Sequence, residues 1–166
     1  MKVVGVGWGS PPRPASVRRP YSYTRRIDVP GSPVQLAMVR RWVHAFLELD
    51  KVATETVEVV VLLASELVAN AVAHSCSREG EVTVLLTLDP ECGRVRLDVI
   101  DDGPAVAVTA GLGSVEHEHG RGLLLVDELS DLWGCYPDEH GTVVWFEVAV
   151  PDQSSCPVTV VRDECG

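Results

Sequence analysis

The sequence predicts an α+β fold, a two-layer α/β sandwich in which helices cover one face of a mixed sheet. Two long stretches, 32–50 and 54–75, repeat apolar residues at the spacing of helices that face a core. Five shorter stretches are rich in β-branched and apolar residues and end at turn residues, as strands do. Their order along the chain is strand, two helices, two strands, loop, helix and two strands.

Local signals place each element. The first helix is expected to start with Ser32 as its cap and Pro33 in its first turn, and to end near Asp50. The second helix, 54–75, has a continuous apolar stripe that would face the sheet. The remaining expectations are strands over 21–29, 81–89, 94–101, 132–136 and 142–150, a turn at 90–93, a loop over 102–119, and a short helix over 123–129.

A chain of 166 residues, 46% of them hydrophobic, predicts one domain, which we place over residues 21–150. Residues 1–20 are rich in Gly, Pro, Ser and Arg and predict a disordered tail. Residues 151–166 predict a second tail, in which 158–161 could add a short strand. Because no apolar run approaches about 18 residues, no membrane span is expected.

The charge is −10 and unevenly placed, since six basic and no acidic residues precede Asp28. The acidic remainder argues against direct binding to nucleic acid. It could complement a basic region of a partner protein, or only keep the protein soluble.

The five cysteines are odd in number and form no C-x-x-C pair, so neither a disulfide framework nor a structural zinc site is expected. Reduced thiols indicate a cytoplasmic protein. Export is the weaker alternative, because Arg18-Arg19 is not followed by an apolar segment.

The second helix carries a polar row. Glu66, Asn70 and His74 are four residues apart, so their side chains lie on adjacent turns of one face. The row could be the polar edge of an ordinary amphipathic helix. It could also be part of a site, because an Asn carbonyl can ligate magnesium and a nearby Glu can orient or deprotonate a nucleophile.

Two further motifs follow in the chain. Asp101-Asp102-Gly103-Pro104 ends a strand, where a carboxylate can accept a hydrogen bond from an exocyclic amine such as that of adenine. Gly120-Arg121-Gly122 precedes a helix whose free N–H groups suit phosphates. Taken singly, the first could be only a turn, and the second matches neither the Walker pattern nor G-x-G-x-x-G.

Together, in this order, the three motifs resemble a known superfamily. SELVANAVAHS is similar to the N box of the gyrase, heat-shock chaperone, histidine kinase and MutL ATPases (the GHKL superfamily). VIDDGP resembles their first glycine box, and HGRGLLLVDELSDLWG with GTVVWFEV resembles the second and the closing strands. The resemblance covers residues 26–150. It is greatest to stand-alone bacterial anti-sigma-factor serine/threonine kinases, the small actinobacterial ATP-binding regulators.

The resemblance implies a Bergerat-type, histidine kinase-like ATPase fold that binds ATP and Mg²⁺. It implies that Glu66 is the catalytic base and that Asn70 is the magnesium ligand. The remaining nucleotide contacts that it implies are Asp101 at adenine, Gly103 behind the ring, Gly120, Arg121, Gly122 and Leu123 at the phosphates, and Thr142 near adenine. Residues 106–119 would be the lid over ATP.

The sequence departs from the family pattern at Ala105, which stands where a second glycine is usual and puts the shape of the lid hinge in question. No phosphoacceptor-histidine domain precedes the fold, so a two-component sensor kinase is not supported. His74 is interpreted as a packed or supporting histidine rather than a phosphoacceptor.

The resemblance therefore implies an ATP-binding regulator that phosphorylates a serine or threonine on an antagonist protein and alternates between that antagonist and a sigma factor. An ATP-gated binding module of the same fold, without phosphotransfer, stays open as the alternative. So does the oligomeric state, including a homodimer. A metal-dependent hydrolase using Glu66, His74 and Glu116-His117-Glu118-His119 is a third reading, which lacks a motif such as H-E-x-x-H.

Overall fold

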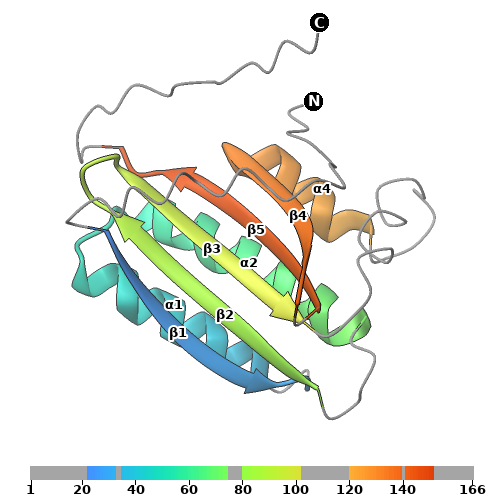
Figure 1. The fold of residues 1–166 in the computed structure, drawn as a ribbon. Coiled ribbons are helices and arrows are strands. Elements are labelled where there is room, and N and C mark those ends of the chain that lie inside the picture. Colours follow the sequence, from blue (N-terminus) through green and yellow to red (C-terminus); the bar gives the residue numbers. More distant parts are fainter. Residues whose placement is uncertain (1–21, 33–34, 75–79, 102–119, 140, 152–166) are drawn as a thin grey trace, which may run out of the picture.

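The computed structural model describes residues 22–32, 35–74, 80–101, 120–139 and 141–151. Within them the chain forms a five-stranded sheet with three helices on one face (Figure 1). The elements are β1 (Tyr23–Pro30), α1 (Leu36–Leu49), α2 (Thr54–His74), β2 (Glu81–Asp89), β3 (Arg94–Asp101), α4 (Gly120–Leu129), β4 (Leu132–Asp138) and β5 (Gly141–Ala149). The predicted order of elements and the α+β sandwich are confirmed.

The sheet has the strand order β1-β2-β3-β5-β4. Every pairing among these strands is antiparallel, so the expectation of a mixed sheet is wrong. The reason is the path of the chain after β3. The connection through α4 leads to β4 at the edge of the sheet, and β5 then returns between β3 and β4, antiparallel to both. The tight turn between β2 and β3 needs Gly93, whose φ of 58° is rarely adopted by residues with a Cβ.

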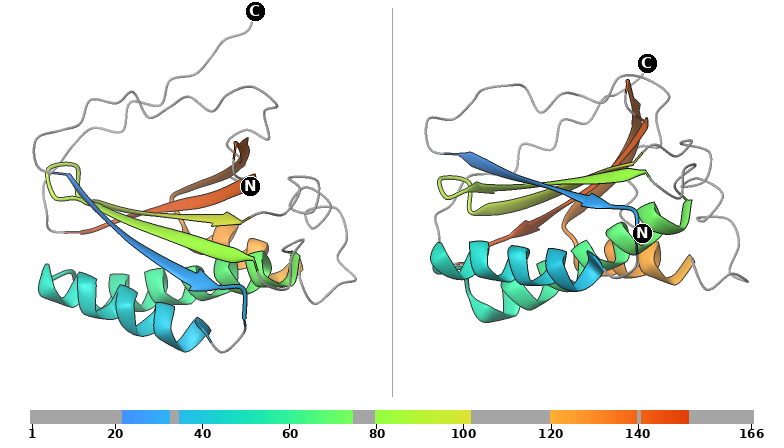
Figure 2. Two further views of the ribbon diagram at one scale, coloured as in Figure 1. Left: turned by 60° about the horizontal axis from the view of Figure 1, so that its bottom comes forward. Right: turned by 90° about the horizontal axis from the view of Figure 1, so that it is seen from below.

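Helix α2 lies in the middle of the helix layer and contacts α1, α4 and the sheet (Figure 2). Its apolar stripe is buried against β2, β3 and β5, and it comprises Val57, Val60, Leu63, Ala64, Leu67, Val68 and Ala71. Full burial of an aliphatic side chain contributes roughly 1.5–3 kcal/mol, so this stripe stabilises the sandwich along its whole length.

Among the described residues, Thr54–Ala73 of α2 is long and apolar enough to cross a membrane by length and composition alone. The expectation that no such segment exists was therefore too strict. The burial of its apolar stripe beneath the sheet accounts for its composition, since a core helix meets the same test.

The ends of the elements differ from the predictions in two informative places. Helix α1 begins at Leu36, and its N-cap is Gln35 rather than the predicted Ser32. The Ser32 carbonyl accepts a hydrogen bond from the Gln35 N–H. Helix α4 begins at Gly120 rather than 123, so the predicted turn is the helix's own first turn. The predicted tail 1–20, all of the predicted tail 151–166 except its first residue, the strand at 158–161 and the lid at 106–119 lie outside the described residues.

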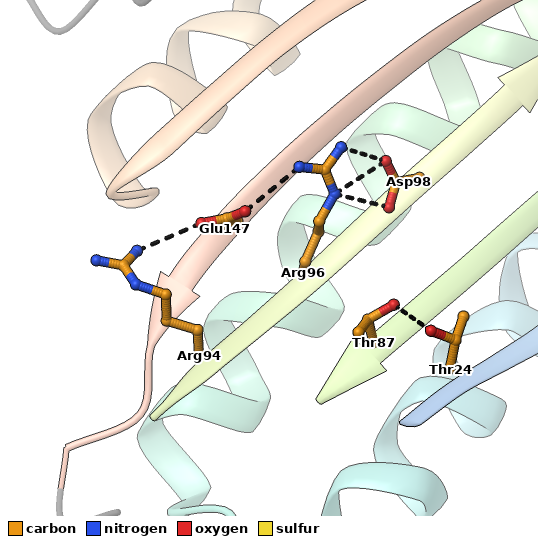
Figure 3. Close-up of polar contacts among 6 residues, drawn as sticks. All are labelled: Thr24, Thr87, Arg94, Arg96, Asp98 and Glu147. Carbon is orange, nitrogen blue, oxygen red and sulfur yellow. Dashed lines mark hydrogen bonds and ion pairs between the residues drawn. The ribbon is translucent and has the colours of Figure 1, made fainter. Parts of the chain in front are cut away.

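The sheet face opposite the helices carries a polar row along β3 and β5 (Figure 3). Arg96 binds the Asp98 carboxylate at 2.7 Å and Glu147 at 3.3 Å, and Arg94 binds Glu147 at 3.4 Å. The Arg96 guanidinium also stacks over the Trp145 ring, 4.1 Å from its centroid. Burial opposes the charge of Arg96, but Asp98 and Glu147 outweigh it and raise its pKa.

Candidate functional site

Glu66 and Asn70 of the polar row lie on the side of α2 that faces α4. Glu66 and Asn70 are both half-buried, one turn apart, and α2 packs directly against α4. Because the apolar stripe of α2 occupies the side toward the sheet, these two polar side chains lie at the junction between the helices. The prediction that they belong to one face is confirmed.

Gly122, in the first turn of α4, lies where this helix approaches the polar face of α2. A Cβ at this position would lie 2.8 Å from Glu66 Oε2 and 3.3 Å from Asn70 Nδ2. Any side chain here would have to displace one of these groups, since real Cβ atoms essentially never come within 3.0 Å of another heavy atom. Glycine therefore lets the start of α4 approach the carboxylate and the carboxamide.

Asn70 Nδ2 is buried and has no hydrogen-bond partner among the described residues. An unpaired buried donor costs about 1–3 kcal/mol, so folded proteins rarely keep one without a use. The assignment of N and O in an amide follows from its partners, and either end of the Asn70 amide suits a ligand. The nitrogen can donate to a phosphate oxygen, and the oxygen can ligate a cation.

The start of α4 adds a second feature suited to anions. The N–H groups in the first turn of a helix lack helical partners, and the macrodipole gives this end a partial positive charge. Gly120, Arg121 and Gly122 form this turn, and it lies against Glu66 and Asn70 through Gly122. The Leu123 side chain is in the core, so only its backbone is suited to a phosphate.

A second polar pair lies at the end of β3. The residues of β3 that face the helices are Val95, Leu97, Val99 and Asp101, so the last is a carboxylate in an otherwise aliphatic series. Thr142 is its register partner on β5 and begins a similar series there. Both side chains are buried, with 6% and 1% of their surface exposed. Ligand pockets are mostly apolar with a few placed polar groups, and this pair at one end of an apolar layer has that character.

These two pairs come from distant parts of the sequence but from neighbouring elements. Helix α2 contacts both β3 and β5, and the ends of β3 and α2 lie with the start of α4 at one side of the sandwich (Figures 1 and 2). Gly103 lies outside the described residues, and the side chains of His74 and Arg121 are not described. The described residues contain no group of three metal-ligating side chains, and 116–119 are not among them.

A hydrogen bond that the sequence did not predict joins α1 to α2 beside Glu66. Arg40 Nε donates to Ser65 Oγ at 2.7 Å, and this hydroxyl donates to the Val61 carbonyl at 2.7 Å. Ser65 is 3% exposed and precedes Glu66, so α1 is tied to α2 beside the polar row. Ser65 is a polar residue within the apolar stripe of α2, and this departure from the pattern could have indicated a buried hydrogen bond.

The described residues form an α+β sandwich in which a buried acid at a strand end and a helix that begins with glycine flank a polar face of α2. The family model of the histidine kinase-like ATPase domain matches residues 29–148. The chain belongs to this family. No curated protein sequence matches it.

Domains of this family bind ATP, usually with Mg²⁺. The described residues fit such a ligand in two respects: Asn70 Nδ2 is buried without a hydrogen-bond partner among them, and the lack of a Cβ at Gly122 lets the start of α4 approach Glu66 and Asn70. Neither Cys92 nor Cys135 forms a disulfide, which agrees with the expected thiols for the cysteines that the structure describes.

Proposed function

We propose that this protein is an ATP-dependent regulator that phosphorylates a serine or threonine of an antagonist protein, and that it binds a sigma factor when the antagonist is absent. The observation that carries the proposal is the approach of Gly122 to Glu66 and Asn70. This approach brings together a helix N-terminus, a carboxylate and an amide whose nitrogen has no hydrogen-bond partner among the described residues. A phosphoryl-transfer site needs groups of these kinds.

Each group has a distinct role in this proposal. The N–H groups at the start of α4 would hold the phosphates, and the Asn70 oxygen would hold magnesium, which neutralises phosphate charge when bound. Asp101 would accept a hydrogen bond from the adenine amine, with Thr142 beside it.

Glu66 would act on the incoming protein substrate rather than on the nucleotide. Its carboxylate would accept or orient the proton of the attacking hydroxyl, a contribution typically worth about 10²–10⁴-fold in rate. Because Gly122 approaches Glu66 Oε2 so closely, this carboxylate lies next to the end of α4 where the phosphates would bind.

The charge of the chain supports the proposal of protein partners. A protein of charge −10 suits basic surfaces of other proteins and disfavours direct contact with nucleic acid. We propose that it works in the cytoplasm and apart from membranes, in keeping with the thiols expected of its cysteines; its oligomeric state, including a homodimer, stays open.

Transfer of labelled γ-phosphate from ATP to an antagonist encoded beside the gene tests the proposal. Glu66→Ala should keep near-normal ATP affinity and slow transfer by about 10²-fold or more. Asn70→Ala should weaken the magnesium dependence of ATP binding and also stop transfer. Glu58→Ala, which removes an exposed carboxylate two turns earlier on α2, is the matched control and should behave as wild type.

Three outcomes discriminate between the readings. If the protein binds ATP but never phosphorylates a verified partner, the ATP-gated binding module replaces the kinase. If Glu66→Ala transfers phosphate at the wild-type rate, α2 does not supply the base. If no ATP binds at any magnesium concentration, both readings fail.

A further inference from the structure

The surface where α1 ends and α2 begins combines three exposed glutamates and a half-buried aspartate with an exposed leucine. We call it the α1–α2 corner, and it comprises Glu48, Leu49, Asp50, Glu55 and Glu58. Leu49 is 77% exposed and the Glu48 side chain is 63% exposed. Lys51 is the opposing charge within this stretch, so the corner is acidic overall.

Glu48 and Asp50 lie at the C-terminal end of α1, where negative charge is unfavourable, whereas Glu55 lies in the favourable first turn of α2. A helix C-terminus carries a partial negative charge and is stabilised by cations in its last turn. The last turn of α1 has no basic residue, and Glu48 and the C-cap Asp50 add negative charge there. His44 lies 3.1 Å from Glu48 and compensates only when protonated. The corner therefore lacks a permanent cation from α1 itself.

The start of β1 lies beside this corner. The Tyr23 hydroxyl donates a hydrogen bond to Asp50, and the Tyr23 ring packs edge-on against Phe46 of α1, with centroids 5.9 Å apart. Arg25, two residues on, places its guanidinium over the same Phe46 ring at 4.9 Å. The chain that precedes Tyr23 is therefore attached next to Asp50, and the first basic side chain of β1 already lies on α1.

We propose that residues 13–21 dock on the α1–α2 corner and supply the cations that α1 lacks. This segment contains Arg13, Arg18 and Arg19 and no acidic residue. Arg18 and Arg19 are within four residues of Ser22, a reach of roughly 13 Å along an extended chain. Its arginines would pair with the carboxylates, and their aliphatic stems would cover Leu49. The contact ties the start of the sheet to the helix layer, away from the nucleotide site.

Cleavage by trypsin at the Arg18–Arg19 bond of the full-length protein tests the contact, because cleavage reports how often a segment is released. The corner variant is the triple substitution Glu48→Gln, Glu55→Gln and Glu58→Gln, which creates no new cleavage site. The control is Glu81→Gln, Glu128→Gln and Glu139→Gln, which makes the same charge change at exposed residues elsewhere. Melting temperatures of both variants verify that they are folded.

The corner variant should be cut about three- to tenfold faster than wild type, and the control at the wild-type rate. Wild type should approach the rate of the corner variant in about 1 M salt, where screening is strong. Hydrogen exchange of residues 13–21 in wild type should show protection that salt removes. Equal cleavage rates in all three proteins, or no salt-sensitive protection, would overturn the proposal.

Discussion

Replacing Gly122 with alanine adds one methyl group where α4 meets α2. The new carbon would lie 2.8 Å from Glu66 Oε2, 3.4 Å from Glu66 Cβ and 3.3 Å from Asn70 Nδ2. The closest of these atoms ends a flexible side chain, so we expect the Glu66 carboxylate to rotate away while the two helices keep their positions. Overpacking typically costs about 1–3 kcal/mol, and alanine recovers up to about 1 kcal/mol of helix propensity. Stability should therefore fall by no more than about 2 kcal/mol.

The Gly122→Ala substitution should weaken ATP binding more than it lowers the free energy of unfolding. The methyl group crowds the Asn70 amide and the space at the start of α4, where the phosphates are proposed to bind. Loss of one charge-assisted hydrogen bond costs about 1.5–3 kcal/mol, so ATP affinity should fall roughly ten- to hundredfold. Adenosine, which has no phosphates, should bind as before. Calorimetric titration of both ligands, with thermal unfolding of the same samples, measures the difference.

Gly134→Ala is the matched control. Its Cβ would lie 3.2 Å from three atoms of the rigid Trp145 indole, on the outer face of the sheet. It should lose about 1–3 kcal/mol of stability and keep its ATP affinity. The reasoning is refuted if Gly122→Ala binds ATP as tightly as wild type, or if ATP and adenosine weaken equally.

Three further predictions concern other parts of the fold. Asp101→Ala should weaken ATP about ten- to hundredfold in a protein that still unfolds cooperatively; unchanged affinity in titration would remove Asp101 from the adenine site. Phe146→Ala should cost about 3–5 kcal/mol in urea unfolding, because Phe146 is fully buried; a cost below about 1 kcal/mol would contradict that packing. Burial, and then the hydrogen bond and charge of Asp50, raise the pKa of Tyr23 from 10.0 to about 12. The folded state thus favours the neutral hydroxyl, and this stabilisation is complete below about pH 10 and lost as pH rises through about 12. Tyr23→Phe should make the alkaline loss of stability shallower between these values, and an identical pH profile would disprove the contribution.

Local pattern determined most of the elements of this chain. The periodicity of α2 placed its start at Thr54, and the alternating apolar residues of β2 and β3 gave the bounds of both strands as the structure has them. These signals are reliable because each element buries one face, so its sequence must repeat with the period of its backbone. The motifs at Glu66, Asp101 and Gly122 were also local, and they were enough to indicate a nucleotide-binding ATPase fold.

The tertiary structure alone decided how the strands pair and which groups meet. Antiparallel pairing of β3 with β5 depends on where the chain returns after α4, and strand composition does not encode that return. The contact of Gly122 with Glu66 joins residues 56 positions apart, and the pairing of Asp101 with Thr142 spans 41. Sequence spacing predicts neighbours within a helix or strand, but these contacts depend on how α2, α4 and the sheet pack together. Only packing revealed that Asn70 Nδ2 is buried without a hydrogen-bond partner among the described residues, because burial is a property of all the surrounding elements at once.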